Sequence, residues 1–133
     1  MVAPKIKMKA ILHKEFGGPE VLGVTNDVEI PQIEKHEVLI QVHAAGINRP
    51  DILQRSGGYP PPPGASEILG LEVSGEIVDV GEDVNKNLLN TKVCALVPGG
   101  GYAEFVKCHT STILPIPKGL SLIHISEPTR RYR

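Results

Sequence analysis

Metal chemistry needs side chains that can gather around an ion, and this sequence supplies few of them. The five histidines are scattered along the chain without ligand spacing: His13, His36, His43, His109 and His124. The two cysteines form no Cys-x-x-Cys pair and are too few for a disulfide framework or a structural zinc cluster. We therefore expect no metal site. We expect Cys94 and Cys108 to be reduced, half-buried strand residues and His43 to be a packed or surface residue on a strand.

Two polar side chains, Asn48 and Tyr59, stand in turn-rich segments where they could donate hydrogen bonds to a ligand. Positioned donors of this kind stabilise negative charge that develops on a carbonyl oxygen. The residues alone leave a second interpretation open for each. The Tyr59 ring, between Gly58 and Pro60, could simply cover the end of a barrel, and Asn48 could be a turn residue in the left-handed conformation.

The glycine cluster after Pro98, at Gly99, Gly100 and Gly101, is the remaining candidate for binding chemistry. It lacks the Gly-x-Gly-x-x-Gly spacing, and no helical pattern follows it. We expect a turn or a close-approach loop there. The chain therefore carries no recognisable cradle for the phosphates of a nucleotide cofactor.

Composition limits what can position these residues. A chain of 133 residues, 41% hydrophobic, can hold one ordinary domain. The net charge of -1 leaves no basic stripe for nucleic acid or for a membrane surface. No apolar run approaches the roughly 20 residues that span a bilayer, and because no apolar run follows the first lysines we expect no secretory signal. We expect a cytoplasmic protein that binds neither nucleic acid nor membrane.

Short alternating segments separated by turn residues predict a mainly β fold, as a small barrel or sandwich. Strands are expected at residues 9–13, 37–45, 71–80, 92–97 and 102–108. In the second of these, Val38, Ile40 and Val42 fall on one face. One helical turn is expected at residues 50–55, because Pro50 suits a first helical position and glycines follow. The four prolines at 60–63 predict an extended loop.

Several ordered segments carry a resemblance to a known family. Residues 45–55 read AGINRPDILQR, residues 58–66 read GYPPPPGAS and residues 69–75 read LGLEVSG. Supporting matches lie at residues 16–22, 99–104 and 115–121. Together they resemble the medium-chain dehydrogenase/reductase superfamily, in its zinc-free, zeta-crystallin-like quinone oxidoreductase branch.

The resemblance implies a GroES-like, partly open β-barrel over residues 8–119, with residues 1–7 as a flexible extension. In the family, a Rossmann domain follows and supplies most of the NADPH site, and that domain is missing from this sequence. The chain is thus expected to be the amino-terminal, substrate-side domain of a longer enzyme. The full-length parent is expected to be a homo-oligomer.

The resemblance also decides the metal question. Zinc enzymes of the superfamily place a cysteine ligand where this chain has Asn48 and a histidine ligand where it has Leu71. Leucine cannot coordinate zinc. The zinc-free interpretation is therefore favoured.

The same resemblance implies roles for the polar residues. Tyr59 is expected to be the hydrogen-bond donor or proton-delivery residue towards the substrate oxygen. Asn48 is expected to position the substrate or the nicotinamide ribose. Glu72 is expected to be structural, with a buried partner such as a backbone amide or an arginine. A structural hydrogen-bonded turn is expected from Arg49, Asp51, Gln54 and Arg55, although Arg55 could neighbour the substrate entrance.

Two segments depart from the family pattern. Asn90 and Thr91 replace the usual Gly-Asp turn, which can survive because asparagine tolerates positive φ. Residues 120–133 read LSLIHISEPTRRYR, which resembles the translation of a sequencing-library adapter. The hypothesis is a non-native tail, and the alternative is a divergent genuine one. Codons across residues 122–130 that differ from the adapter would refute the hypothesis.

The expected function is transfer of hydride from NADPH to quinones or other α,β-unsaturated carbonyls, without zinc. The chain alone is expected to be inactive, because the cofactor's phosphates have no site in it. Two alternatives remain open: an enoyl-thioester reductase of the same superfamily and a non-enzymatic, crystallin-like structural role.

Overall fold

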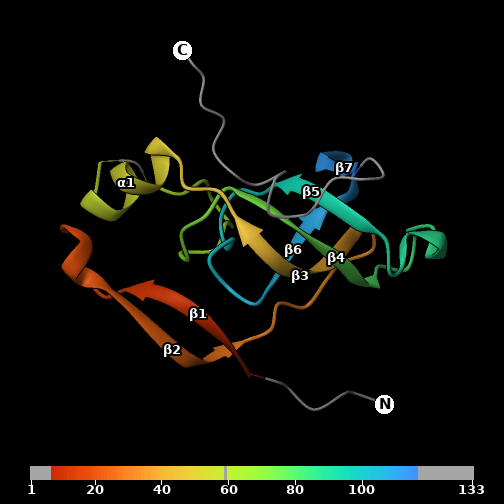
Figure 1. The fold of residues 1–133 in the computed structure, drawn as a ribbon, viewed down its shortest axis with the longest axis horizontal. Coiled ribbons are helices and arrows are strands. Elements are labelled where there is room, and N and C mark those ends of the chain that lie inside the picture. The colour runs from red at the N-terminus through yellow and green to blue at the C-terminus, as the bar shows by residue number, and fades with distance from the viewer. Residues whose placement is uncertain (1–6, 59, 117–133) are drawn as a thin grey trace.

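The computed structural model describes residues 7–58 and 60–116 (Figure 1). Residues 1–6 of the expected extension, Tyr59 and the expected tail at 120–133 lie outside the described residues. The first strand begins at Lys7, the last residue of the expected extension, and Lys7 Nζ lies 3.1 Å from Asp27 Oδ1 on the neighbouring strand.

The described chain is mainly β, as predicted. It contains β1 (Lys7–His13), β2 (Leu22–Glu29), β3 (Glu37–Ala45), β4 (Glu72–Val80), β5 (Lys92–Leu96), β6 (Phe105–His109) and β7 (Ile113–Pro115). One helix, α1 (Arg49–Ser56), and three short 3-10 turns, η1 (Pro19–Val21), η2 (Lys86–Leu88) and η3 (Thr110–Thr112), complete the described elements.

The strands form two antiparallel sheets. β1 pairs with β2 as a separate ribbon, and the second sheet has the order β6-β3-β4-β5-β7. β6 and β7 stand at its two edges and do not pair, so the curved sheet stays open. The predicted partly open barrel is confirmed, and the described residues contain no parallel Rossmann sheet.

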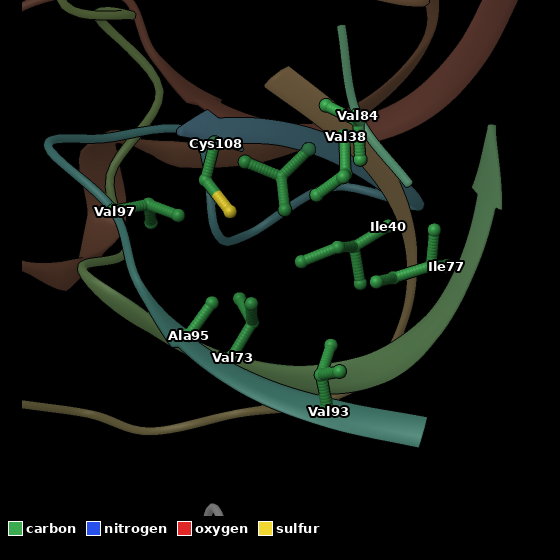
Figure 2. Packing of buried hydrophobic residues seen from close by; sticks show 10 residues of the cluster. Val38, Ile40, Val73, Ile77, Val84, Val93, Ala95, Val97 and Cys108 are labelled. Carbon is green, nitrogen blue, oxygen red and sulfur yellow. The ribbon is translucent and has the colours of Figure 1, made fainter. Parts of the chain in front are cut away.

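The core lies inside the curve of the five-stranded sheet. Val38 and Ile40 of β3 are 0% exposed and Val42 packs against them, which confirms the predicted apolar face. Figure 2 shows side chains from four strands pointing toward one another: Val38, Ile40, Val73, Ile77, Val93, Ala95 and Cys108. This burial of β-branched side chains provides the main hydrophobic stabilisation of the fold.

Gly75 explains how β4 can follow the curve of β3. The pairing of these strands shifts register between Val42 and Ala44, which marks a bulge or irregularity, and Gly75 lies opposite Val42. A Cβ at Gly75 would collide with the carbonyl oxygen of Gln41. Only glycine permits this close backbone approach inside a strand.

The turn before β5 forms as expected, although it lacks the family's glycine. Asn90 adopts φ 67°, and its N–H donates to the carbonyl of Ile77 at 2.8 Å. Thr91 Oγ1 donates to the Leu88 carbonyl at 2.6 Å. The substitution is therefore accommodated by the tolerance of asparagine for the left-handed region.

The β1–β2 ribbon is attached to the rest of the fold at two places. Near the middle of β1, Ala10 bridges Ala103, and the Lys9 N–H donates to Glu104 Oε1 at 2.7 Å. At the η1 end, the loop contacts α1, and Figure 1 shows this turn lying beside the helix. Within the described part of the chain, no helix has the length and apolar character needed to cross a membrane.

Candidate functional site

Helix α1 positions the residues at the centre of the site. It runs for two turns where one was predicted, from Arg49 to Ser56, with Pro50 in its first turn. It ends at Gly57, which has φ 96° and whose N–H donates to the Gln54 carbonyl. Proline at the start and a left-handed glycine at the end fix both boundaries.

Asn48 is the residue immediately before α1, and its backbone is extended, with φ -128° and ψ 159°. The alternative of a left-handed turn residue is therefore wrong. The half-buried side chain is oriented by a hydrogen bond from Nδ2 to Glu72 Oε1 at 3.3 Å. Glu72 thus has the partner expected of it, but that partner is a side-chain amide rather than a backbone amide or an arginine.

Asp51 is the buried anchor of this end of the helix. It is 3% exposed, and its carboxylate accepts three hydrogen bonds. Oδ2 accepts from the Asn48 N–H at 2.9 Å and from the Tyr102 hydroxyl at 2.7 Å, and Oδ1 accepts from the Gly70 N–H at 3.2 Å. These donors compensate a buried carboxylate.

Tyr102 was not identified as a site residue from the sequence. Burial, followed by the hydrogen bond to Asp51 and its charge, raises the pKa of the Tyr102 hydroxyl well above its usual value. The group therefore stays protonated and keeps donating. Its distance of 51 residues from Asp51 along the chain leaves no local pattern that could reveal the pair.

The glycine cluster is a close-approach loop, as predicted. A Cβ on Gly70, which has φ 108°, would lie 2.7 Å from the Gly101 Cα. The N–H groups of Gly100 and Gly101 donate to the carbonyls of Ile68 and Gly70 at 2.7 and 3.0 Å. These amides are therefore occupied and do not form a phosphate cradle.

The C-terminal end of α1 is tied to the loop after β1. Arg55 Nε donates to the Gly17 carbonyl at 3.1 Å, and the Gly17 N–H donates to the Arg55 carbonyl at 3.0 Å. The structural role expected of Asp51 and Arg55 is confirmed. Arg49 is exposed, and the side chains of Arg49 and Gln54 make no hydrogen bond within the described residues, so the expected turn includes two of the four.

The possible metal ligands stay apart. In residues 7–58 and 60–116, no three His, Cys, Asp or Glu side chains gather around a common point. His43 is exposed on β3, and Leu71, at the position of the zinc enzymes' histidine, is half-buried just before β4. The thiol of Cys94 is half-buried and that of Cys108 is buried, and neither forms a disulfide. Burial raises the pKa of Cys108 to about 11 and raises that of Cys94.

The site can thus present one oriented amide. Asn48 Nδ2 has two N–H bonds, and the contact with Glu72 uses one of them. The second can donate to an oxygen of a bound molecule. Tyr59, the other predicted site residue, lies outside the described residues.

Comparison with protein families and known proteins supplies the context. Residues 34–118 match the alcohol dehydrogenase GroES-like domain. The quinone oxidoreductase of Mus musculus is 42% identical over 86% of this chain and 35% of its own length. The chain therefore spans about a third of the length of the curated relatives that it matches.

Solved structures agree with the sequence comparison. The quinone oxidoreductase of Coxiella burnetii superposes with a TM-score of 0.77 at 33% identity, covering 87% of this chain and 39% of that one. The human synaptic vesicle membrane protein VAT-1 homolog-like protein gives a TM-score of 0.82 at 27% identity, over 91% and 38%. The predicted resemblance to quinone oxidoreductases of the medium-chain superfamily is confirmed.

Proposed function

Because the chain belongs to the alcohol dehydrogenase GroES-like domain family, and its relatives include quinone oxidoreductases, we propose that it is the substrate-side domain of an NADPH-dependent quinone oxidoreductase. In this proposal the domain occupies residues 8–119. The full-length enzyme is a cytoplasmic homo-oligomer that reduces quinones or related α,β-unsaturated carbonyls without zinc.

The observation that carries the proposal is the oriented amide of Asn48. Glu72 accepts one of its N–H bonds, and Asp51 accepts the backbone N–H of the same residue. The side chain is therefore held at both its backbone and its amide. A donor fixed in this way stabilises the oxygen anion that forms when hydride adds to a quinone carbonyl, without the cost of reorienting during the reaction.

Tyr59 completes the proposed chemistry. Its hydroxyl delivers a proton, or a strong hydrogen bond, to the oxygen that becomes negative. Asn48 then positions the substrate or the nicotinamide ribose. A phenol suits this role because it both donates and can relay a proton.

In this proposal the chain contributes only a small part of the NADPH site. When bound, NADPH supplies the hydride. The amides of Gly100 and Gly101 are already paired, and no other glycine-rich cradle stands within the described residues, so its phosphates require residues beyond them. We accordingly propose that residues 1–133 alone do not turn over substrate.

The proposal is tested with the full-length protein that contains this chain. We expect 1,4-naphthoquinone to support NADPH oxidation, and Asn48→Ala to lower kcat/KM by about 100-fold, as loss of one oriented donor would. An enoyl thioester tested beside the quinone separates the alternative reductase. Failure of the wild-type protein to oxidise NADPH with the quinone would refute the proposal.

A further inference from the structure

A cavity of about 220 Å³ opens beside the C-terminal end of α1. Three segments contribute to it: the end of β1 and its loop, the end of α1, and the proline-rich loop. The side chains that matter are His13, Phe16, Gln54, Pro60, Pro61 and Glu67. Asn48 and Glu72 do not line this cavity, so it is distinct from the oriented amide of Asn48.

Gln54 supplies the observation that points to a ligand. The residue is only 3% exposed, yet its carboxamide makes no hydrogen bond within the described residues. Among those residues, every side-chain nitrogen or oxygen atom that is fully buried from solvent has a hydrogen-bond partner. The amide must therefore open onto the cavity that it lines. A buried amide without a partner gains free energy when a ligand supplies one.

The side chains that line the cavity suit a ligand with a flat ring. Phe16 is 66% exposed, an unusual state for a phenylalanine, and its ring lies 6.1 Å from that of His13 at a tilt of 36°. Pro60 and Pro61 add apolar rings to the lining. An exposed aromatic face gains stability by stacking on a planar ligand.

Charge and size narrow the choice of ligand. Glu67 is the acidic side chain at the cavity, so an anionic ligand is disfavoured. The volume falls below the roughly 300 Å³ of the smallest pockets for drug-sized molecules, so one substituted ring fits better than a long molecule.

We propose that this cavity is a second subsite for a neutral quinone ring, with Gln54 bonded to a ring oxygen and Phe16 stacked on the ring. The choice of a quinone rests on the function proposed above. Gln54 lies six positions after Asn48, about 9 Å along the helix axis, so the two amides stand at opposite ends of α1. Because an amide both donates and accepts, it binds a quinone oxygen and a hydroquinone hydroxyl alike.

Duroquinone is a suitable probe, because methyl groups occupy every free ring carbon and hinder addition of the cysteine thiols. Its binding is measured by calorimetry on the full-length protein without NADPH. We expect Gln54→Leu to weaken binding about tenfold and Phe16→Leu about fivefold. Gln32→Leu, which changes an exposed glutamine between β2 and β3, is the matched control and should leave binding unchanged. The reduced form, durohydroquinone, should bind within about threefold of duroquinone.

The proposal is overturned if duroquinone does not bind, or if Gln54→Leu and Phe16→Leu bind it as the wild type does. It is also overturned if Gln32→Leu weakens binding to the same extent. Should Gln54→Leu lower the thermal midpoint, Phe16→Leu decides, since its ring is largely exposed. A protein that binds duroquinone through these residues but does not oxidise NADPH refutes the proposed function and leaves this subsite standing.

Discussion

The two ends of α1 differ in how their buried polar groups are satisfied. At the N-terminal end, the Asp51 carboxylate receives three hydrogen bonds from backbone and side-chain donors. At the C-terminal end, the Gln54 carboxamide is equally buried but has no partner among the described residues. Both residues lie on the same short helix, three positions apart, so the helix itself does not explain the contrast.

The difference separates two uses of a buried polar side chain. A fully paired carboxylate fixes the position of its neighbours, here Asn48 and the strand entry at Gly70. An unpaired amide beside a cavity keeps its donor and acceptor groups available for hydrogen bonds with a ligand. Under the two proposals, the first end sets the geometry for chemistry and the second end binds a ligand.

The strongest way to break the comparison is to remove the carboxylate. Asp51→Ala leaves the Tyr102 hydroxyl and two backbone N–H groups without their acceptor, and should lower the free energy of unfolding by about 4 kcal/mol. Urea unfolding followed by circular dichroism measures this. Asp27→Asn, at a side chain 85% exposed, is the control and should change stability by less than about 0.5 kcal/mol. Equal effects of the two variants would contradict the role of Asp51.

Tyr59→Phe in the full-length enzyme tests the chemistry proposed for that residue. Loss of the hydroxyl should lower kcat about 100-fold and raise KM less, because the donor acts on charge that forms in the transition state. Steady-state oxidation of NADPH with a quinone gives both constants. An unchanged kcat would remove Tyr59 from its proposed role.

Tyr102→Phe isolates one of the three donors to Asp51. It should lower the free energy of unfolding by about 1–2 kcal/mol at neutral pH. The pKa of Tyr102 is raised from 10.0 in the folded state, so its contribution is fully present below pH 10. Above that pH the unfolded chain ionises while the folded state keeps the proton, and stability falls.

The pH dependence of the free energy of unfolding is the control for the Tyr102→Phe prediction. The fall in stability above pH 10 should be steeper in the wild type than in Tyr102→Phe, since the variant has no hydroxyl to titrate at this position. Denaturation midpoints from pH 8 to 11 measure the difference. Parallel profiles would contradict the proton held between Tyr102 and Asp51.

The smallest effect on stability is expected at the C-terminal end of α1. Gln54→Leu should change the free energy of unfolding by no more than about 0.5 kcal/mol, because it removes an amide that has no protein partner and keeps the packed volume. Thermal unfolding of the variant beside the wild type checks this. A loss comparable to that of Asp51→Ala would show that Gln54 is structural and would remove the contrast between the two ends.

Sequence reasoning succeeded where the signal is local. The bounds of β3 match the prediction, because alternation and burial coincide over nine residues. β2 was missed because most of its residues are exposed and it contains Gly23, Asn26 and Asp27, which are unfavourable in strands. β7 has three residues and ends in proline, too short for a pattern.

The candidate site was predicted only in part, because most of its contacts join residues that are distant in sequence. Asn48 was identified through the resemblance, and its contact with Glu72 joins residues 24 apart. The Asp51–Tyr102 pair and the open amide of Gln54 depend on how distant segments meet. Neither residue type nor spacing along the chain carries that information.

The contact between Lys9 and Glu104 also constrains the order in which the protein forms. These residues are 95 positions apart in sequence, and the bridge between Ala10 and Ala103 spans a similar separation. During synthesis on the ribosome, β1 and β2 can form their ribbon early, but that ribbon has no barrel to dock on until residue 104 has left the exit tunnel. The β1–β2 ribbon is therefore among the last parts of this fold to find its place, and its exposed apolar residues, Val24 of β2 at 72% above all, are the surface that a nascent-chain chaperone would meet.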